Sequence, residues 1–187
     1  MSEWRTSDEE EKYFAEQDRR LRLGIKADIQ RSQAQLEQAL AVAKVVGSDD
    51  PDIGDALTEL GFSVETARVL FYVPLLQVAW ADGKMGFDES SLILDSARAQ
   101  GLSATSPAYA RLDELTRTRP SEGFFTGAIR VCRELVGKGA GFDSASTLDL
   151  MNKVAGAQGG FLGFGNKVSD EEKAAIDKLV RELNLSR

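Results

Sequence analysis

The sequence predicts an all-α protein: a compact, pseudo-symmetric bundle of about seven or eight helices with a long amphipathic helix at its N-terminus. Two observations lead to this fold class. Apolar residues recur at steps of three, four and seven along most of the chain, which is the period of an α-helix. No stretch alternates apolar and polar residues long enough to indicate a half-buried strand. Helices without a sheet bury their apolar faces against one another, so a bundle follows.

Length and charge set the domain organisation and exclude some functions. The 187 residues suffice for one well-buried domain with an extension, which we expect at residues 51–187 and 1–50. A net charge of -7 argues against a nucleic-acid partner, because such binding needs clustered Lys and Arg. The chain has no histidine, which removes the commonest general base and the usual catalytic triads. We therefore expect a protein that is not an enzyme.

Cysteine content and hydropathy indicate the compartment. The single cysteine, Cys132, permits no internal disulfide and fits a reducing compartment, where we expect it to be a buried packing residue. Residues 1–5 do not resemble the start of a signal peptide. No segment reaches the ~20 apolar residues of a membrane span. The sequence thus predicts a cytoplasmic protein without direct membrane insertion.

The first helix is predicted over residues 8–46, with Ser7 and the following acids as its start signal and residues 47–51 as its end. Its charged sequence carries a narrow apolar stripe: Phe14, Leu21, Ile25, Ile29, Leu36, Leu40 and Ala43. Two roles remain open for this helix. It either packs on the domain as a solvated helix or pairs with a partner, including a second copy of the chain.

Residues 64–81 are apolar on most sides of a helical repeat, which predicts a buried central helix with Ser63 as its cap. Pro74 should bend or divide this helix unless a break precedes it. Five further helices are indicated by start signals at Asp88, Ser106-Pro107, Pro120-Ser121-Glu122, Phe142-Asp143-Ser144 and Ser169. The glycine-rich residues 156–166 between the last two lack the ending of a P-loop, so no phosphate site is expected.

A short internal repeat suggests a cation site. Residues 83–93 align without a gap with residues 166–176, and both copies place a glutamate, Glu89 or Glu172, at the start of a helix. Asp82 and Glu89 can converge across the turn between two helices. Backbone carbonyls would complete the all-oxygen shell that calcium, magnesium or manganese prefers. The candidate ligands are Asp82, Glu89 and Glu172, and the second copy is expected to be weaker because Gln158 replaces its aspartate.

Helix capping is the alternative explanation of both glutamates. Ser169-x-x-Glu172 is a capping box, in which each side chain accepts a backbone N–H, and Gly86-x-x-Glu89 is a weaker version of it. Asp82 is harder to explain in this way, because an acid at a helix C-terminus opposes the dipole. Asp82 therefore carries most of the functional prediction.

Three segments together resemble the tellurite-resistance TerB-like family over about residues 63–185: residues 79–85 with Glu89, residues 160–165, and residues 168–172. The resemblance implies a pseudo-symmetric helical domain whose acidic loops bind a divalent cation. It also implies a non-enzymatic role in stress response, with protein partners that include a membrane-associated complex. Carried over by position, it points to Asp82, Glu89 and Glu172, and Gln158 departs from the acidic pattern.

Two functions follow from these patterns. The first is a divalent-cation-binding interaction module of TerB type in tellurite or chemical stress response. The second is a structural adaptor or assembly protein that uses its N-terminal helix, including for self-association, while the acidic turns serve only as helix caps.

Overall fold

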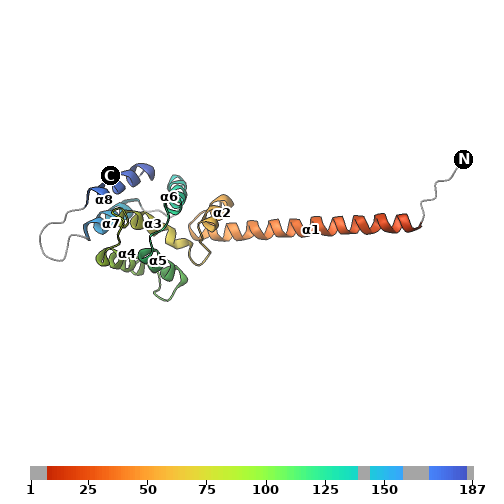
Figure 1. Ribbon diagram of the computed structural model, residues 1–187, viewed down its shortest axis with the longest axis horizontal. Coiled ribbons are helices and arrows are strands. Elements are labelled where there is room, and N and C mark those ends of the chain that lie inside the picture. The colour runs from red at the N-terminus through yellow and green to blue at the C-terminus, as the bar shows by residue number, and fades with distance from the viewer. Residues whose placement is uncertain (1–7, 139–143, 158–168, 185–187) are drawn as a thin grey trace. The chain divides into compact units, whose positions relative to one another are not determined.

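A computed structural model of the protein describes residues 8–138, 144–157 and 169–184 (Figure 1). This part of the chain forms eight α-helices and one 3₁₀-helix without any strand, which confirms the all-α prediction. The helices are α1 (Asp8–Val45), α2 (Pro51–Glu59), η1 (Ala67–Tyr72), α3 (Val73–Ala79), α4 (Phe87–Ala99), α5 (Pro107–Arg117), α6 (Glu122–Gly137), α7 (Ser144–Ala157) and α8 (Asp170–Glu182). None of the described helices is long and apolar enough to cross a membrane.

The chain divides into two compact units between Gln38 and Ala39, inside α1. The end of α1 belongs to the second unit, where Ala39, Val42 and Ala43 are at most 2 % exposed. A Cβ built at Gly54 of α2 would lie 1.8 Å from the carbonyl oxygen of Ala39. The two backbones therefore approach so closely that only glycine fits at this position.

The core of the second unit is built around α3, which contacts η1, α4, α6, α7 and α8. Its apolar residues Leu75, Leu76 and Val78 are at most 1 % exposed. The stretch predicted as one helix is divided into η1 and α3, and Pro74 lies in the first turn of α3. Proline is well tolerated there because the N–H that it lacks has no partner within the helix. Ser63 caps no helix but forms a turn, in which its hydroxyl accepts from Glu65 N at 3.2 Å.

Three of the predicted serine start signals are confirmed, while Ser7 lies outside the described residues. Ser106, Ser121 and Ser169 cap α5, α6 and α8, each accepting a backbone N–H three residues further on at 3.1–3.2 Å. Gly101, with φ of +89°, follows the end of α4. Cys132 is fully buried beside the carbonyl oxygen of Leu70, and this burial raises the pKa of its thiol well above the ordinary range. It is a packing residue, as expected.

Candidate functional site

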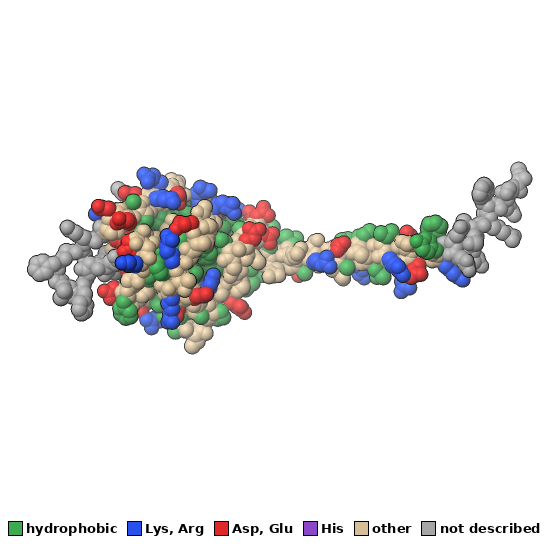
Figure 2. All heavy atoms as spheres, in the orientation of Figure 1, with side chains coloured by type: hydrophobic (Ala, Val, Ile, Leu, Met, Phe, Trp, Pro, Cys, Tyr) green, Lys and Arg blue, Asp and Glu red, His purple; other side chains and the backbone are tan. Residues whose placement is uncertain are grey.

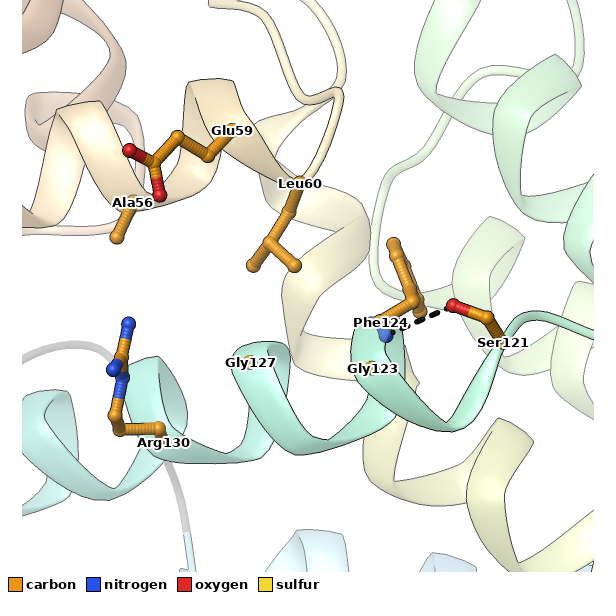
Figure 3. Close-up of a pocket in the computed structure, with 8 residues that line it drawn as sticks. All are labelled: Ala56, Glu59, Leu60, Ser121, Gly123, Phe124, Gly127 and Arg130. Atoms are coloured by element: carbon orange, nitrogen blue, oxygen red, sulfur yellow. Dashed lines mark hydrogen bonds between the residues drawn. The ribbon is translucent and has the colours of Figure 1, made fainter.

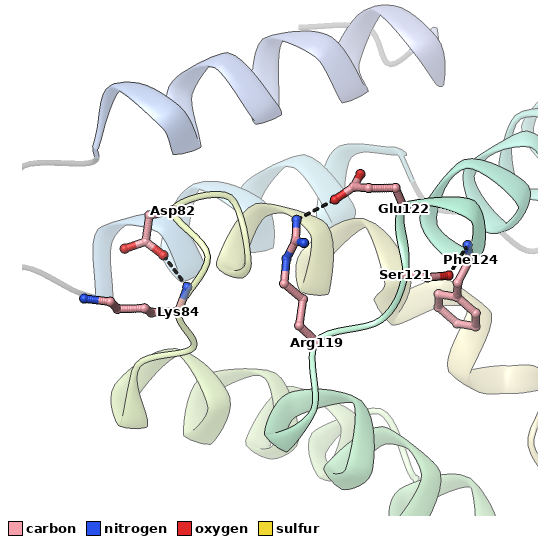
Figure 4. Close-up of polar contacts among 6 residues, drawn as sticks. All are labelled: Asp82, Lys84, Arg119, Ser121, Glu122 and Phe124. Atoms are coloured by element: carbon pink, nitrogen blue, oxygen red, sulfur yellow. Dashed lines mark hydrogen bonds and ion pairs between the residues drawn. The ribbon is translucent and has the colours of Figure 1, made fainter.

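The acidic turn after α3 is held by its own backbone and by one buried side chain. Trp80, 8 % exposed, donates from Nε1 to the carbonyl oxygen of Leu115 at 3.0 Å and so ties the end of α3 to α5. Gly83 adopts φ of +84°, a conformation that side chains rarely permit. Asp82 Oδ1 accepts from Lys84 N at 2.9 Å (Figure 4). This contact is an Asx turn, so Asp82 stabilises the loop locally, a role that the capping argument missed.

Glu89 lies in the first turn of α4 and is fully buried. Its Oε2 accepts from the backbone N–H of Gly86 at 2.6 Å, three residues earlier. Glycine offers no hydroxyl for the reciprocal bond, so only the glutamate half of a capping box is present. The carboxylate also lies at the positive end of the helix dipole, where a negative charge is favoured.

Glu172 repeats this arrangement at α8 in a more complete form. Its Oε2 accepts from Ser169 N at 2.7 Å, while Ser169 Oγ accepts from Glu172 N at 3.1 Å. The side chain is 1 % exposed, and its second oxygen, Oε1, is buried without a hydrogen-bond partner among the described residues. Gln158 and the predicted glycine-rich loop at 160–165 lie outside the residues that the structure describes.

Each predicted ligand thus serves a nearby backbone N–H. Within residues 8–138, 144–157 and 169–184, no group of three or more Cys, Asp and Glu residues is placed to hold a metal ion. The capping explanation accounts for Glu89 and Glu172, and the Asx turn gives Asp82 a structural role as well. The second carboxylate oxygen of Glu172, which has no hydrogen-bond partner among the described residues, is available to a cation.

A second feature, which the sequence did not indicate, is an open groove of about 480 Å³ between α2 and α6 (Figure 3). Leu60 and Phe124 supply apolar surface, and Glu59 and Arg130 face each other across the opening. Both charged residues are exposed. The hydroxyl of Ser121 at the edge of the groove already accepts from Phe124 N, as the cap of α6. The groove is an open amphipathic surface without an assembled catalytic group.

The third feature is the first unit, where every side chain from residue 11 to residue 38 is exposed. Hydrophobic side chains lie along α1 among charged ones (Figure 2). Five large ones fall on a single helical face and are 49–65 % exposed: Phe14, Leu21, Ile25, Ile29 and Leu36. Soluble monomers rarely leave so many large apolar side chains on one face in water, so the face is a candidate binding surface.

Three ion pairs within the helix lie on or beside this face. Arg20 bonds Glu16 at 2.7 Å, Arg22 bonds Asp18 at 3.4 Å, and Arg31 bonds Asp28 at 3.1 Å. Such exposed pairs at three- and four-residue spacing each add a few tenths of a kcal/mol to a helix. They keep α1 helical and soluble without covering its apolar face.

No protein family, characterised protein or solved structure matches the chain in comparisons with those that are known. The resemblance to the TerB-like family is not tested by these comparisons and stays a prediction.

Proposed function

We propose that the protein is a non-enzymatic assembly module, in which the helical domain is joined to other protein through the apolar face of α1. The observation that carries this proposal is the row of five large apolar side chains, each about half exposed or more. Burial of apolar surface stabilises by roughly 25 cal/mol per Å², so the row gains free energy once it is covered. The hydrogen bonds of the acidic turns support the same conclusion, because they are those of helix caps and an Asx turn.

A helix is the partner that suits this face. The apolar residues form a narrow stripe with polar neighbours on both sides, which is typical of a seam between two helices. A sheet or a globular pocket would need a wider or shorter apolar surface. The polar flanks stay in water when one helix covers the stripe, so their ion pairs are retained.

The chain offers a matched pair of variants to test this proposal. Ile25→Asp places a carboxylate in the stripe, and Leu23→Asp places one on the opposite side of the same helix, where Leu23 is equally exposed at 59 %. We expect the full-length protein, at its natural level in an extract of the producing cells, to elute as an assembly larger than one chain. Ile25→Asp should move it to the monomer position, and Leu23→Asp should not.

An unmodified protein that elutes as a monomer in the extract would contradict the assembly role. So would equal behaviour of the two variants, since a general effect of added charge would then explain the change. Thermal unfolding of both purified variants serves as a further control. Leu23 and Ile25 lie outside the second unit, which begins at Ala39. The unfolding temperature of that unit should therefore be the same in both variants and in the unmodified protein.

A second candidate function is divalent-cation binding of the TerB type, within a stress response and a membrane-associated complex. The observation that favours it is the buried Glu172 carboxylate, whose second oxygen lacks a hydrogen-bond partner among the described residues. Calorimetry with calcium, magnesium and manganese tests it. This candidate predicts a measurable heat of binding. The affinity for the cation should fall at least tenfold in Glu172→Gln and in Asp82→Ala. Titrations without heat, or with heat unchanged in both variants, would rule it out.

A further inference from the structure

The apolar face of α1 has spacings that read the same in both directions. From Phe14 the steps are seven, four, four and seven residues, with Ile25 at the centre and Leu36 at the end. From Phe14 to Leu36 the row extends over 22 residue steps, or about 33 Å at the helical rise of 1.5 Å per residue. A two-fold axis at Ile25 relates this row to itself when a second helix runs in the opposite direction.

We propose that the partner covering this face is a second copy of the chain, with the two α1 helices antiparallel and the two-fold axis at Ile25. This inference rests on the assembly function proposed above. Ile25 then meets Ile25, Phe14 meets Leu36 of the second copy, and Leu21 meets Ile29. Every large side chain of the row gains an apolar neighbour, as an isologous interface requires.

The repeat also permits contact along the whole row. Ile25 lies eleven residues after Phe14 and eleven residues before Leu36. An eleven-residue repeat corresponds to 3.67 residues per turn. At 100° per residue the row drifts by only about 40° over its 22 positions. Two nearly straight helices can therefore keep the row between them from end to end.

The two polar positions within the row distinguish the antiparallel pair from a parallel one. Asp18 and Ser32 lie at equal distances, seven residues, from Ile25. In an antiparallel pair the carboxylate of Asp18 faces the hydroxyl of Ser32, which can donate to it. In a parallel pair Asp18 faces Asp18, and the two carboxylates, each held by Arg22 of its own helix at 3.4 Å, come together inside the seam. Like charges at that position oppose association, as they do in coiled coils.

The acidic start of the helix favours the same orientation. Sequence positions 8–11 are all Asp or Glu. A parallel pair in register brings these two runs side by side. An antiparallel pair centred on Ile25 separates them by about 45 Å, which is several times the Debye length of about 8 Å at physiological salt. Antiparallel pairing removes this repulsion.

Cysteine cross-linking of the full-length protein tests the arrangement. Cys132 does not interfere, because it is fully buried. With copper–phenanthroline as oxidant, we expect Ile25→Cys to cross-link to itself, and a mixture of Phe14→Cys and Leu36→Cys to give the mixed dimer. Phe14→Cys alone, Leu36→Cys alone and the opposite-face control Leu23→Cys should stay uncross-linked.

Sedimentation of the purified protein supplies the independent measurement. We expect a species of twice the 20.4 kDa of one chain. Ile25→Asp should raise its dissociation constant by about a hundredfold or more, because two apolar side chains at the centre give way to two carboxylates. Leu23→Asp should leave it within about threefold.

The outcomes separate this inference from the function on which it rests. A dimer in which Phe14→Cys and Leu36→Cys each cross-link with themselves overturns the antiparallel arrangement and leaves the assembly role in place. A purified protein that stays monomeric at high concentration overturns the second copy as partner. In that case the elution of the protein from the cell extract still decides whether α1 assembles with a different chain.

Discussion

Gly54→Ala is expected to lower the free energy of unfolding of the helical domain by about 3 kcal/mol or more, which is the range of severe overpacking. The new Cβ would lie 1.8 Å from the carbonyl oxygen and 2.4 Å from the carbonyl carbon of Ala39. Both obstacles are backbone atoms, so a rotamer change cannot relieve them. The end of α1 would have to move away from α2, exposing Val42 and Val46, which are 1 % exposed. Urea unfolding measures the loss.

Gly24→Ala is the matched control for this substitution. Gly24 also lies in a helix, but apart from its chain neighbours and the backbone of its own helix no atom of the described residues stands within 4 Å of the position of its Cβ. There we expect alanine to stabilise the helix by about 1 kcal/mol, because glycine loses more backbone entropy when it becomes helical. A Gly54→Ala protein as stable as the unmodified one would show that α1 and α2 are not packed backbone to backbone.

Local sequence signals predicted most of the fold. Ser106, Ser121 and Ser169 cap the helices that they were expected to begin, and the all-α class follows from periodicity. These predictions succeed because a cap is an interaction between residues three positions apart, so the sequence itself contains both partners. Pro74 illustrates the limit of this reasoning. Its position allowed a bend or a break, and only packing against the other helices decides for the break before α3.

Features that depend on distant parts of the chain could not be predicted. From the sequence, Gly54 is indistinguishable from a glycine that only weakens a helix. Nothing near it in sequence indicates that its backbone packs against the carbonyl group of Ala39. The apolar stripe of α1 likewise continues from Phe14 to Ala43 at one period. Periodicity gives the face of a helix that avoids water, but not the protein that covers it. The burial that begins at Ala39 therefore had no signal in the pattern.

The candidate cation site shows the same difference between local interactions, which the sequence predicts, and contacts between distant residues, which it does not. The capping box at Ser169 and Glu172 was predicted as an alternative and is present, since it too is local. The role of Asp82 was missed, although Asp followed by Gly is a common turn signal and its carboxylate reaches the N–H two residues on. Convergence of several carboxylates on one ion depends on tertiary structure, and the sequence could suggest it only through the internal repeat and the resemblance.

Glu89→Ala is expected to lower the free energy of unfolding by about 2–3 kcal/mol, because a hydrogen bond to a buried carboxyl oxygen is lost and a helix cap with it. The bond to Gly86 N is short, at 2.6 Å, and the side chain is fully buried. Glu89→Gln keeps an oxygen in place and should lose about half as much. Asp82→Ala removes an acceptor in an exposed turn, where water can replace it, and should change stability by less than about 1 kcal/mol. Urea unfolding of the three variants measures this order.

The same variants separate a cap from a cation ligand. A cap acts within its own helix, so the loss in Glu89→Ala should be equal with a chelator and with saturating calcium or magnesium. A ligand of the folded state adds stability that grows with the logarithm of its concentration. If Glu89 helped to hold a cation, the unmodified protein would gain stability from the ion and Glu89→Ala would not. The difference between the two proteins would then widen with added metal, which is the result that would return the acidic turn to a binding role.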